Sequence, residues 1–131
     1  MGYLLDTNVV ISLRDADTPM DASLEQLDSI PALSIVTRVE LEGGVVARPH
    51  LTARRRAALD ILLRLLPVLD FDEHCGDAYR TIVEASGLSR RKIADRMIAA
   101  TALAHGLTVI TANPGDFRDI PDLSLETWPS A

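Results

Sequence analysis

The stretch Gly2-Tyr3-Leu4-Leu5-Asp6-Thr7-Asn8-Val9-Val10-Ile11 joins two apolar runs through an aspartate. Residues 2–5 predict a short buried strand, and residues 8–14 predict the start of a helix. An acid at the carboxyl end of a buried strand lies where open α/β sheets place their chemistry. The chain then continues to alternate strands with helices. This pattern predicts an α/β fold, a three-layer α/β/α arrangement around a mostly parallel central sheet.

The remaining elements are bounded by proline, glycine and capping residues. Further strands are expected at residues 33–36, 68–69, 107–111 and 123–125. Further helices are expected at residues 22–27, from 38 to about 43–44 or slightly beyond, at 51–66, at 72–85 and at 93–105.

Bulk properties restrict the class of protein. A length of 131 residues suits a single domain, 1–131, with a sizeable core. The only cysteine, Cys75, excludes a disulfide framework and a thiolate zinc site. No apolar run is long enough to cross a bilayer, and the first residues lack a signal-peptide pattern. We therefore expect a soluble cytoplasmic protein without a membrane partner. The net charge of −6 argues weakly against broad binding of nucleic acid.

Four acids stand where apolar runs start or stop: Asp6, Glu40, Asp95 and Asp116. Such acids would gather negative charge in one pocket, whose natural occupant is a divalent metal. Oxygen ligands without a cysteine cluster favour Mg²⁺, with Mn²⁺ as a substitute, over Zn²⁺.

Each acid also has a purely structural interpretation. Asp6 fits the start of a helix, with Thr7 or Asn8 as its cap. Glu40 fits a capping box that begins at Thr37, and spacing alone favours that role, although a carboxylate can serve both roles. For two acids, position favours a functional site. Asp95 shares a helix face with the apolar residues three, four and seven positions on. Asp116 follows the clearest strand, although Pro-Gly before it also makes a turn.

Four motifs carry a resemblance to a known family. They are Leu4-Leu5-Asp6-Thr7-Asn8, Ser34-Ile35-Val36-Thr37-Arg38-Val39-Glu40-Leu41, Asp95-Arg96-Met97-Ile98-Ala99-Ala100-Thr101-Ala102 and Thr111-Ala112-Asn113-Pro114-Gly115-Asp116-Phe117. Together they resemble the PIN-domain ribonucleases, and their order and spacing are most similar to the VapC toxins of bacterial toxin–antitoxin pairs. The match runs from Tyr3 to about Trp128.

The resemblance implies a Mg²⁺-dependent endoribonuclease that cleaves RNA, is blocked by a VapB antitoxin and forms a homodimer. It also implies that Asp6, Glu40, Asp95 and Asp116 ring one or two metal ions. Many PIN domains have an acid where this chain has Asn113. Asp116 is then the expected fourth carboxylate, with Asn113 beside the ligands or the substrate.

Other polar residues near these motifs have expected roles in the same chemistry. A metal-activated water would attack the phosphodiester. The expected supporting residues are Thr7, Asn8 and Thr111, which orient ligands or water, and Arg91, Lys92 and Arg96, which steer phosphates.

Three alternatives remain at this point. A phosphatase of the haloacid-dehalogenase type also opens with a strand-end aspartate, but it needs a second acid where this chain has Asn8. A receiver-like phosphoacceptor module needs a lysine near a late strand, whereas the only lysine, Lys92, precedes a helix. The third alternative is a chain that acts mainly as a subunit of a partner-bound, DNA-associated complex, with nuclease chemistry as a secondary property.

Overall fold

The computed structural model describes residues 2–16 and 24–129. The strands are β1 (Tyr3–Leu5), β2 (Ala32–Ser34), β3 (Val68–Leu69), β4 (Thr108–Thr111) and β5 (Leu125–Thr127). The α-helices are α1 (Thr7–Asp15), α3 (Ile35–Ala47), α4 (Thr52–Leu65), α5 (Glu73–Ser86) and α6 (Ile93–His105). Three short 3₁₀ helices are η1 (Pro49–Leu51), η2 (Arg90–Lys92) and η3 (Pro114–Phe117).

The strands form one sheet in the order β3-β2-β1-β4-β5, and every neighbouring pair is parallel. The chain moves from β1 outward to β2 and β3, and then returns to place β4 on the other side of β1. This reversal makes the carboxyl ends of β1 and β4 a topological switch point, where open α/β sheets bind their ligands.

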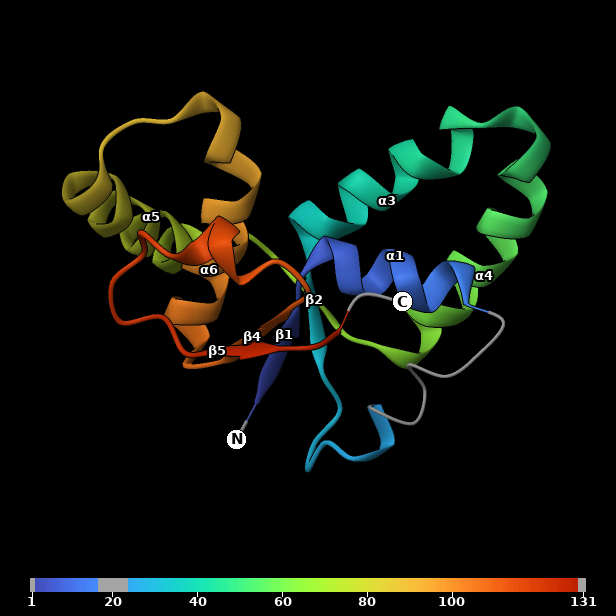
Figure 1. The fold of residues 1–131 in the computed structure, drawn as a ribbon, viewed down its shortest axis with the longest axis horizontal. Coiled ribbons are helices and arrows are strands. Elements are labelled where there is room, and N and C mark those ends of the chain that lie inside the picture. The colour runs from blue at the N-terminus through green and yellow to red at the C-terminus, as the bar shows by residue number, and fades with distance from the viewer. Residues whose placement is uncertain (1, 17–23, 130–131) are drawn as a thin grey trace.

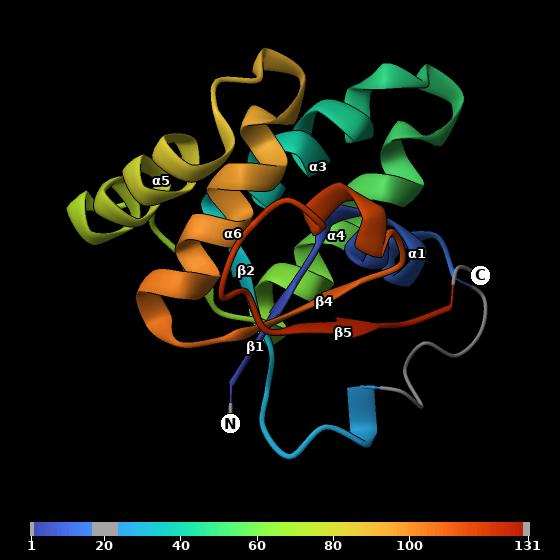
Figure 2. The ribbon, with the colours of Figure 1, turned by 60° about the vertical axis from the view of Figure 1, so that its left-hand side comes forward.

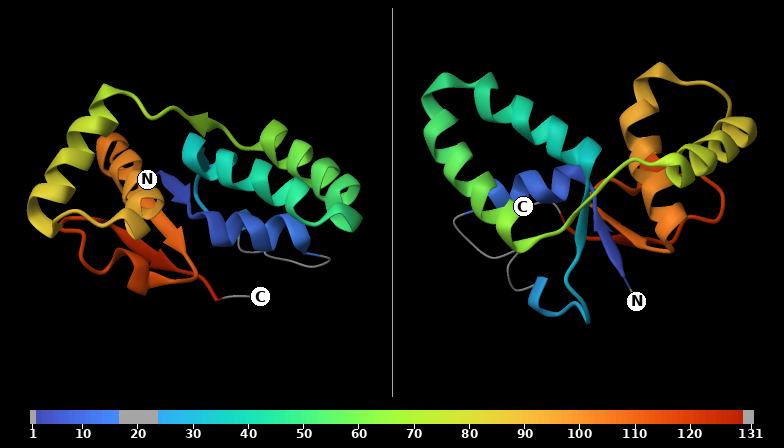
Figure 3. Two further views of the ribbon diagram at one scale, coloured as in Figure 1. Left: turned by 90° about the horizontal axis from the view of Figure 1, so that it is seen from above. Right: turned by 180° about the vertical axis from the view of Figure 1, so that it is seen from behind.

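Helices cover both faces of the sheet. Figure 1 shows α1, α3 and α4 on one side and α5 and α6 on the other, and Figure 3 shows the same division from above and from behind. Alternate strand residues explain why both faces are apolar: Leu5 belongs to one buried cluster and Leu4 to the other. The predicted three-layer α/β/α fold is therefore confirmed.

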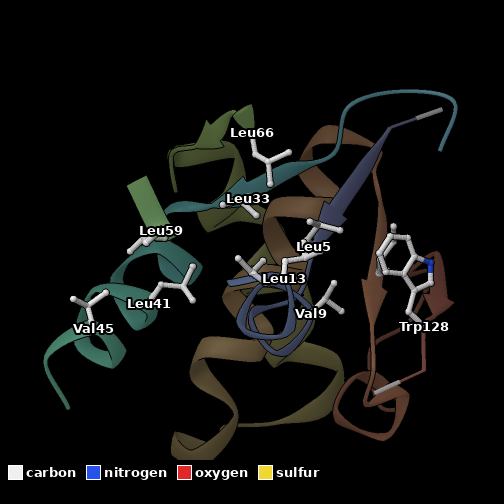
Figure 4. Close-up of a cluster of buried hydrophobic side chains, with 11 residues drawn as sticks. Leu5, Val9, Leu13, Leu33, Leu41, Val45, Leu59, Leu66 and Trp128 are labelled. Atoms are coloured by element: carbon white, nitrogen blue, oxygen red, sulfur yellow. The ribbon is translucent and has the colours of Figure 1, made fainter. Parts of the chain in front are cut away.

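The cluster under α1, α3 and α4 is built from branched side chains. Figure 4 shows Val9 and Leu13 of α1 beside Leu41 of α3 and Leu59 of α4. The opposite cluster also contains branched side chains, such as Ile82 and Ile98, but α6 contributes three alanines to it: Ala99, Ala100 and Ala102. Small side chains allow α6 to lie close to β1 and β4, and this brings the first turn of α6 to the edge of the sheet where the acids are.

Two predicted boundaries are wrong. Helix α3 begins at Ile35, because the Ser34 hydroxyl accepts a hydrogen bond from the Val36 N–H at 3.1 Å. Thr37 therefore lies inside the helix, and the capping box predicted for Thr37 and Glu40 does not form. The helix also continues beyond the predicted Gly43-Gly44 end to Ala47.

The last strand is β5 rather than residues 123–125, and all three of its residues are exposed. An edge strand without a buried face lacks the alternation that identifies strands in a sequence. The helix predicted at residues 22–27 lies partly outside the described residues; within them, Leu24 and Glu25 are helical. In the described ranges no helix is long and apolar enough to cross a membrane.

Candidate active site

Asp6 lies at the switch point between β1 and β4. Its backbone N–H donates to the Ile110 carbonyl at 2.8 Å, so the β1–β4 ladder continues to the aspartate itself. The residue is 2% exposed. Figure 2 shows β1 running directly into α1 while the chain after β4 passes beside the start of that helix. The Ala112 N–H donates to Asn8 Oδ1 at 3.2 Å and ties these two segments together.

Both carboxylate oxygens of Asp6 are held by hydrogen bonds. Oδ1 accepts from the Thr7 N–H at 2.8 Å, which makes Asp6 itself the N-cap of α1. Oδ2 accepts from the Thr111 hydroxyl at 2.8 Å. The Thr111 oxygen in turn accepts from the Asn113 N–H at 2.9 Å. The predicted cap at Thr7 or Asn8 is therefore wrong, because Asp6 itself caps α1. The same contacts fix the direction of its carboxylate.

Glu40 is joined to this group through Thr7. The Thr7 hydroxyl donates to Glu40 Oε1 at 2.7 Å and lies 3.0 Å from the Thr37 hydroxyl. Because Thr7 has one hydroxyl proton, Thr37 must donate to Thr7 when Thr7 donates to Glu40. Thr37 is fully buried. It was assigned to a helix cap from the sequence, although its spacing from Glu40 already placed both on one helix face.

Asp95 and Asp116 complete the group of acids. Burial raises the pKa of Asp95 to about 6, and the charges of Asp6, Asp116 and Glu40 add to the effect while Lys92 opposes it. The pKa of Asp6 is also raised, mainly by burial, and the charges of Asp116 and Glu40 contribute. Four acids, from the junction of β1 and α1, from α3, from α6 and from η3, therefore interact electrostatically.

The donor set fits a hard divalent cation in charge and in atom type. Carboxylate oxygens are the ligands that Mg²⁺ and Mn²⁺ prefer, and a cation would relieve the repulsion that raises both pKa values. In the described residues, however, no three Asp, Glu, His or Cys side chains are already arranged to hold an ion.

Asp116 and Asn113 differ in their surroundings. Burial raises the pKa values of Asp6 and Asp95, and the charge of Asp116 adds to both shifts. Asn113 is exposed where η3 begins, and its backbone N–H is engaged by Thr111.

The basic residues near Asp95 differ in their exposure. Arg91 is exposed on η2, whereas Lys92 donates to Asp119 Oδ2 at 3.3 Å. Arg96 is 2% exposed, and its Nη2 donates to Asp119 Oδ2 at 3.0 Å. The predicted role of Arg96 in steering phosphates does not fit this buried position. Asp119 was missed because its partner lies 23 residues away in the sequence.

Comparison with known proteins agrees with this geometry. The family model named PIN domain matches residues 3–123. The ribonuclease VapC2 of Rickettsia felis is 34% identical, and the alignment covers 98% of each chain. A tRNA(fMet)-specific endonuclease VapC of Salmonella typhimurium is 29% identical over 98% of each chain. A chain in the crystal structure of VapBC2 from Rickettsia felis bound to a promoter DNA fragment superposes with a TM-score of 0.86 at 32% identity, covering 98% of this chain and 99% of that one.

These matches exceed a likeness of fold, because sequence identity and coverage extend over nearly the whole chain. The chain belongs to the PIN-domain family of nucleases and, within it, to the VapC ribonucleases.

Proposed function

We propose that this protein is a Mg²⁺-dependent endoribonuclease and the toxin of a type II toxin–antitoxin pair, with Mn²⁺ able to replace Mg²⁺. One observation carries the proposal: Asp6 is buried with both carboxylate oxygens fixed, and three further acids act on the same point. A group of buried carboxylates lowers the stability of the folded state unless a cation balances their charge. A nuclease uses such a cation directly in its chemistry.

The acids Asp6, Glu40, Asp95 and Asp116 would hold the ion. When bound, it supplies a lowered pKa for a water molecule and positive charge for the phosphate oxygens. The water oxygen forms a new bond to phosphorus, the bond to the leaving ribose oxygen breaks, and that oxygen takes up a proton. Thr111 holds Oδ2 of Asp6, and Thr7 holds Oε1 of Glu40, so both carboxylates face the reaction in a fixed direction.

The rival phosphatase mechanism fits this site poorly. Asn8, where that mechanism needs an acid, accepts from the Ala112 N–H. The receiver-like alternative needs a lysine at a late strand, whereas Lys92 bonds to Asp119.

The proposed partner is a VapB-type antitoxin that blocks the acidic site. Support comes from the Rickettsia felis relative, which was solved as a VapBC complex bound to promoter DNA. A homodimer remains a prediction. A relative named for tRNA(fMet) makes tRNA the first substrate to assay.

The test uses purified protein freed of any antitoxin and incubated with tRNA and other structured RNAs, with and without Mg²⁺. We expect cleavage only with the metal, and loss of cleavage in Asp6→Asn and Asp95→Asn. Asp77→Asn, which alters an exposed acid on α5, serves as the matched control. Cleavage that persists in EDTA, or that survives both substitutions, would refute the proposed mechanism.

A further inference from the structure

We propose that Arg96 and Asp119 form an ion-pair clamp that holds the loop carrying Asp116 against the helix carrying Asp95, so that the two acids can share a metal. Both are positioning residues, since neither is proposed to touch metal or RNA. The inference rests on the proposed function, because it assigns these two acids as ligands.

The clamp joins three segments in one place. Arg96, in the first turn of α6, donates through Nη2 to Asp119 Oδ2 and through Nη1 to the Gly87 carbonyl at the end of α5. The Ser86 hydroxyl donates to the Asp119 carbonyl at 2.6 Å. Asp119 therefore connects the loop after η3 to the end of α5 and the start of α6 at once.

The segment that carries Asp116 needs such an anchor. It is a single 3₁₀ turn, and no side chain caps its start. Its own backbone bonds are few: the Asp116 N–H donates to the Asn113 carbonyl at 3.1 Å, and the Arg118 N–H reaches the Gly115 carbonyl only at 3.4 Å. Isolated 3₁₀ turns have poor hydrogen-bond geometry. Phe117 is buried and fixes one side of the turn, and Asp119 fixes its end.

A short chain of contacts joins the two acids. Asp95 and Arg96 are neighbours in the sequence, the ion pair joins Arg96 to Asp119, and Asp119 lies three residues after Asp116. Asp95 and Asp116 themselves interact only through their charges. Displacement of Asp119 would therefore change the separation of the two ligands.

The burial of Arg96 in the clamp costs free energy. Arg96 Nε is buried and has no hydrogen-bond partner among the described residues. Asp119, the partner of Arg96, is 35% exposed, so solvent screens an attraction that must offset the desolvation of Arg96. A buried arginine with an unsatisfied donor, next to a ligand, is therefore explained best by the geometry it imposes on that ligand.

The first test measures Mn²⁺ binding by electron paramagnetic resonance in the full-length protein, below the melting temperature of every variant. Loss of a partner that orients a ligand typically weakens metal binding by 10- to 100-fold, so we expect Asp119→Asn to raise the dissociation constant about 10-fold. Arg96→Lys keeps the charge but loses the forked contact, and should raise it by a smaller factor. Affinity for tRNA measured in Ca²⁺ should not change.

The matched control is Glu84→Gln, which removes one acid from the exposed Arg80–Glu84 pair on α5. It should leave Mn²⁺ affinity unchanged. Mn²⁺ affinity of Asp119→Asn within twofold of the parent protein would overturn the clamp.

A second measurement requires no metal and so separates the clamp from the proposed function. Hydrogen exchange of the Asp116 amide in the metal-free protein should become at least 10-fold faster in Asp119→Asn, while exchange in β1 stays unchanged. If the parent protein fails to bind Mn²⁺, the proposed metal chemistry is wrong. Hydrogen exchange alone then tests whether Asp119 holds the segment that carries Asp116. Unchanged exchange at Asp116 would overturn the clamp.

Discussion

Replacing Asp95 by asparagine should stabilise the metal-free protein at neutral pH. The pKa of the Asp95 carboxyl is raised from 3.8 to about 6, chiefly by burial and then by the other three acids. One pKa unit corresponds to about 1.4 kcal/mol, so ionised Asp95 destabilises the folded state by at most about 3 kcal/mol. Asp95 is only half-buried, and solvent screening reduces this to about 1 kcal/mol.

The sign of the pH dependence follows from the direction of the pKa change. Because the folded protein binds this proton more tightly than the unfolded chain, the cost of ionised Asp95 is absent below about pH 4. It grows as the pH rises toward 6 and is complete above that value. Asp95→Asn should therefore gain about 1 kcal/mol at pH 7.5 and almost nothing at pH 4.

Urea unfolding in EDTA, followed through the fluorescence of buried Trp128, measures this difference. Asp77→Asn should change stability at neither pH. Added Mg²⁺ should reverse the order at pH 7.5, because the parent protein gains binding energy that the variant lacks. An Asp95→Asn protein that is less stable than the parent in EDTA, or that gains equally at both pH values, would refute the electrostatic argument.

Two further substitutions separate ligand, orienting and structural roles. Glu40→Gln keeps an acceptor for the Thr7 hydroxyl, so the free energy of unfolding should stay within about 0.5 kcal/mol of that of the parent protein. Mg²⁺ binding, measured by calorimetry, should become weaker. A large drop in melting temperature with activity intact would show that Glu40 has a structural role. Thr111→Val removes the donor to Asp6, and should lower the free energy of unfolding in urea by about 1–2 kcal/mol and the metal affinity about tenfold. Thr111→Ser keeps the hydroxyl and should restore most of both quantities. Equal behaviour of the two variants would show that the hydroxyl does not orient Asp6.

Apolar periodicity predicted most of the fold. The helix predicted at residues 93–105 and the strand predicted at 107–111 agree with α6 and β4 to within a residue. Both segments are rich in apolar residues, and Gly106 separates them. The start of α3 was misplaced because Ser34 and Thr37 are both good caps, and only the register of β2 decides between them. Local sequence does not encode that register.

The site shows the same limit. The four acids were predicted as a group because each follows or begins an apolar run in the sequence, although Glu40 lies within α3 rather than at its start. Arg96 and Asp119 could not be paired, since their ion pair depends on how η3 packs against α6. The basic run at residues 90–92 correctly indicated that charged side chains lie next to Asp95. The sequence does not show burial, however, and the buried position of Arg96 changes its interpretation from a phosphate contact to a structural residue.

Asp6 caps α1 and is proposed to hold the metal, and one substitution separates these two roles. Asparagine is as good an N-cap as aspartate, so Asp6→Asn should keep the hydrogen bond from the Thr7 N–H and the start of α1. Burial and the neighbouring acids raise the pKa of Asp6, so a neutral amide also relieves repulsion in the metal-free protein. We therefore expect Asp6→Asn to be at least as stable as the parent protein at pH 7.5 in EDTA, and yet to lose both Mg²⁺-dependent stabilisation and RNA cleavage. Loss of helix content by circular dichroism would instead mean that the carboxylate is needed for the fold itself.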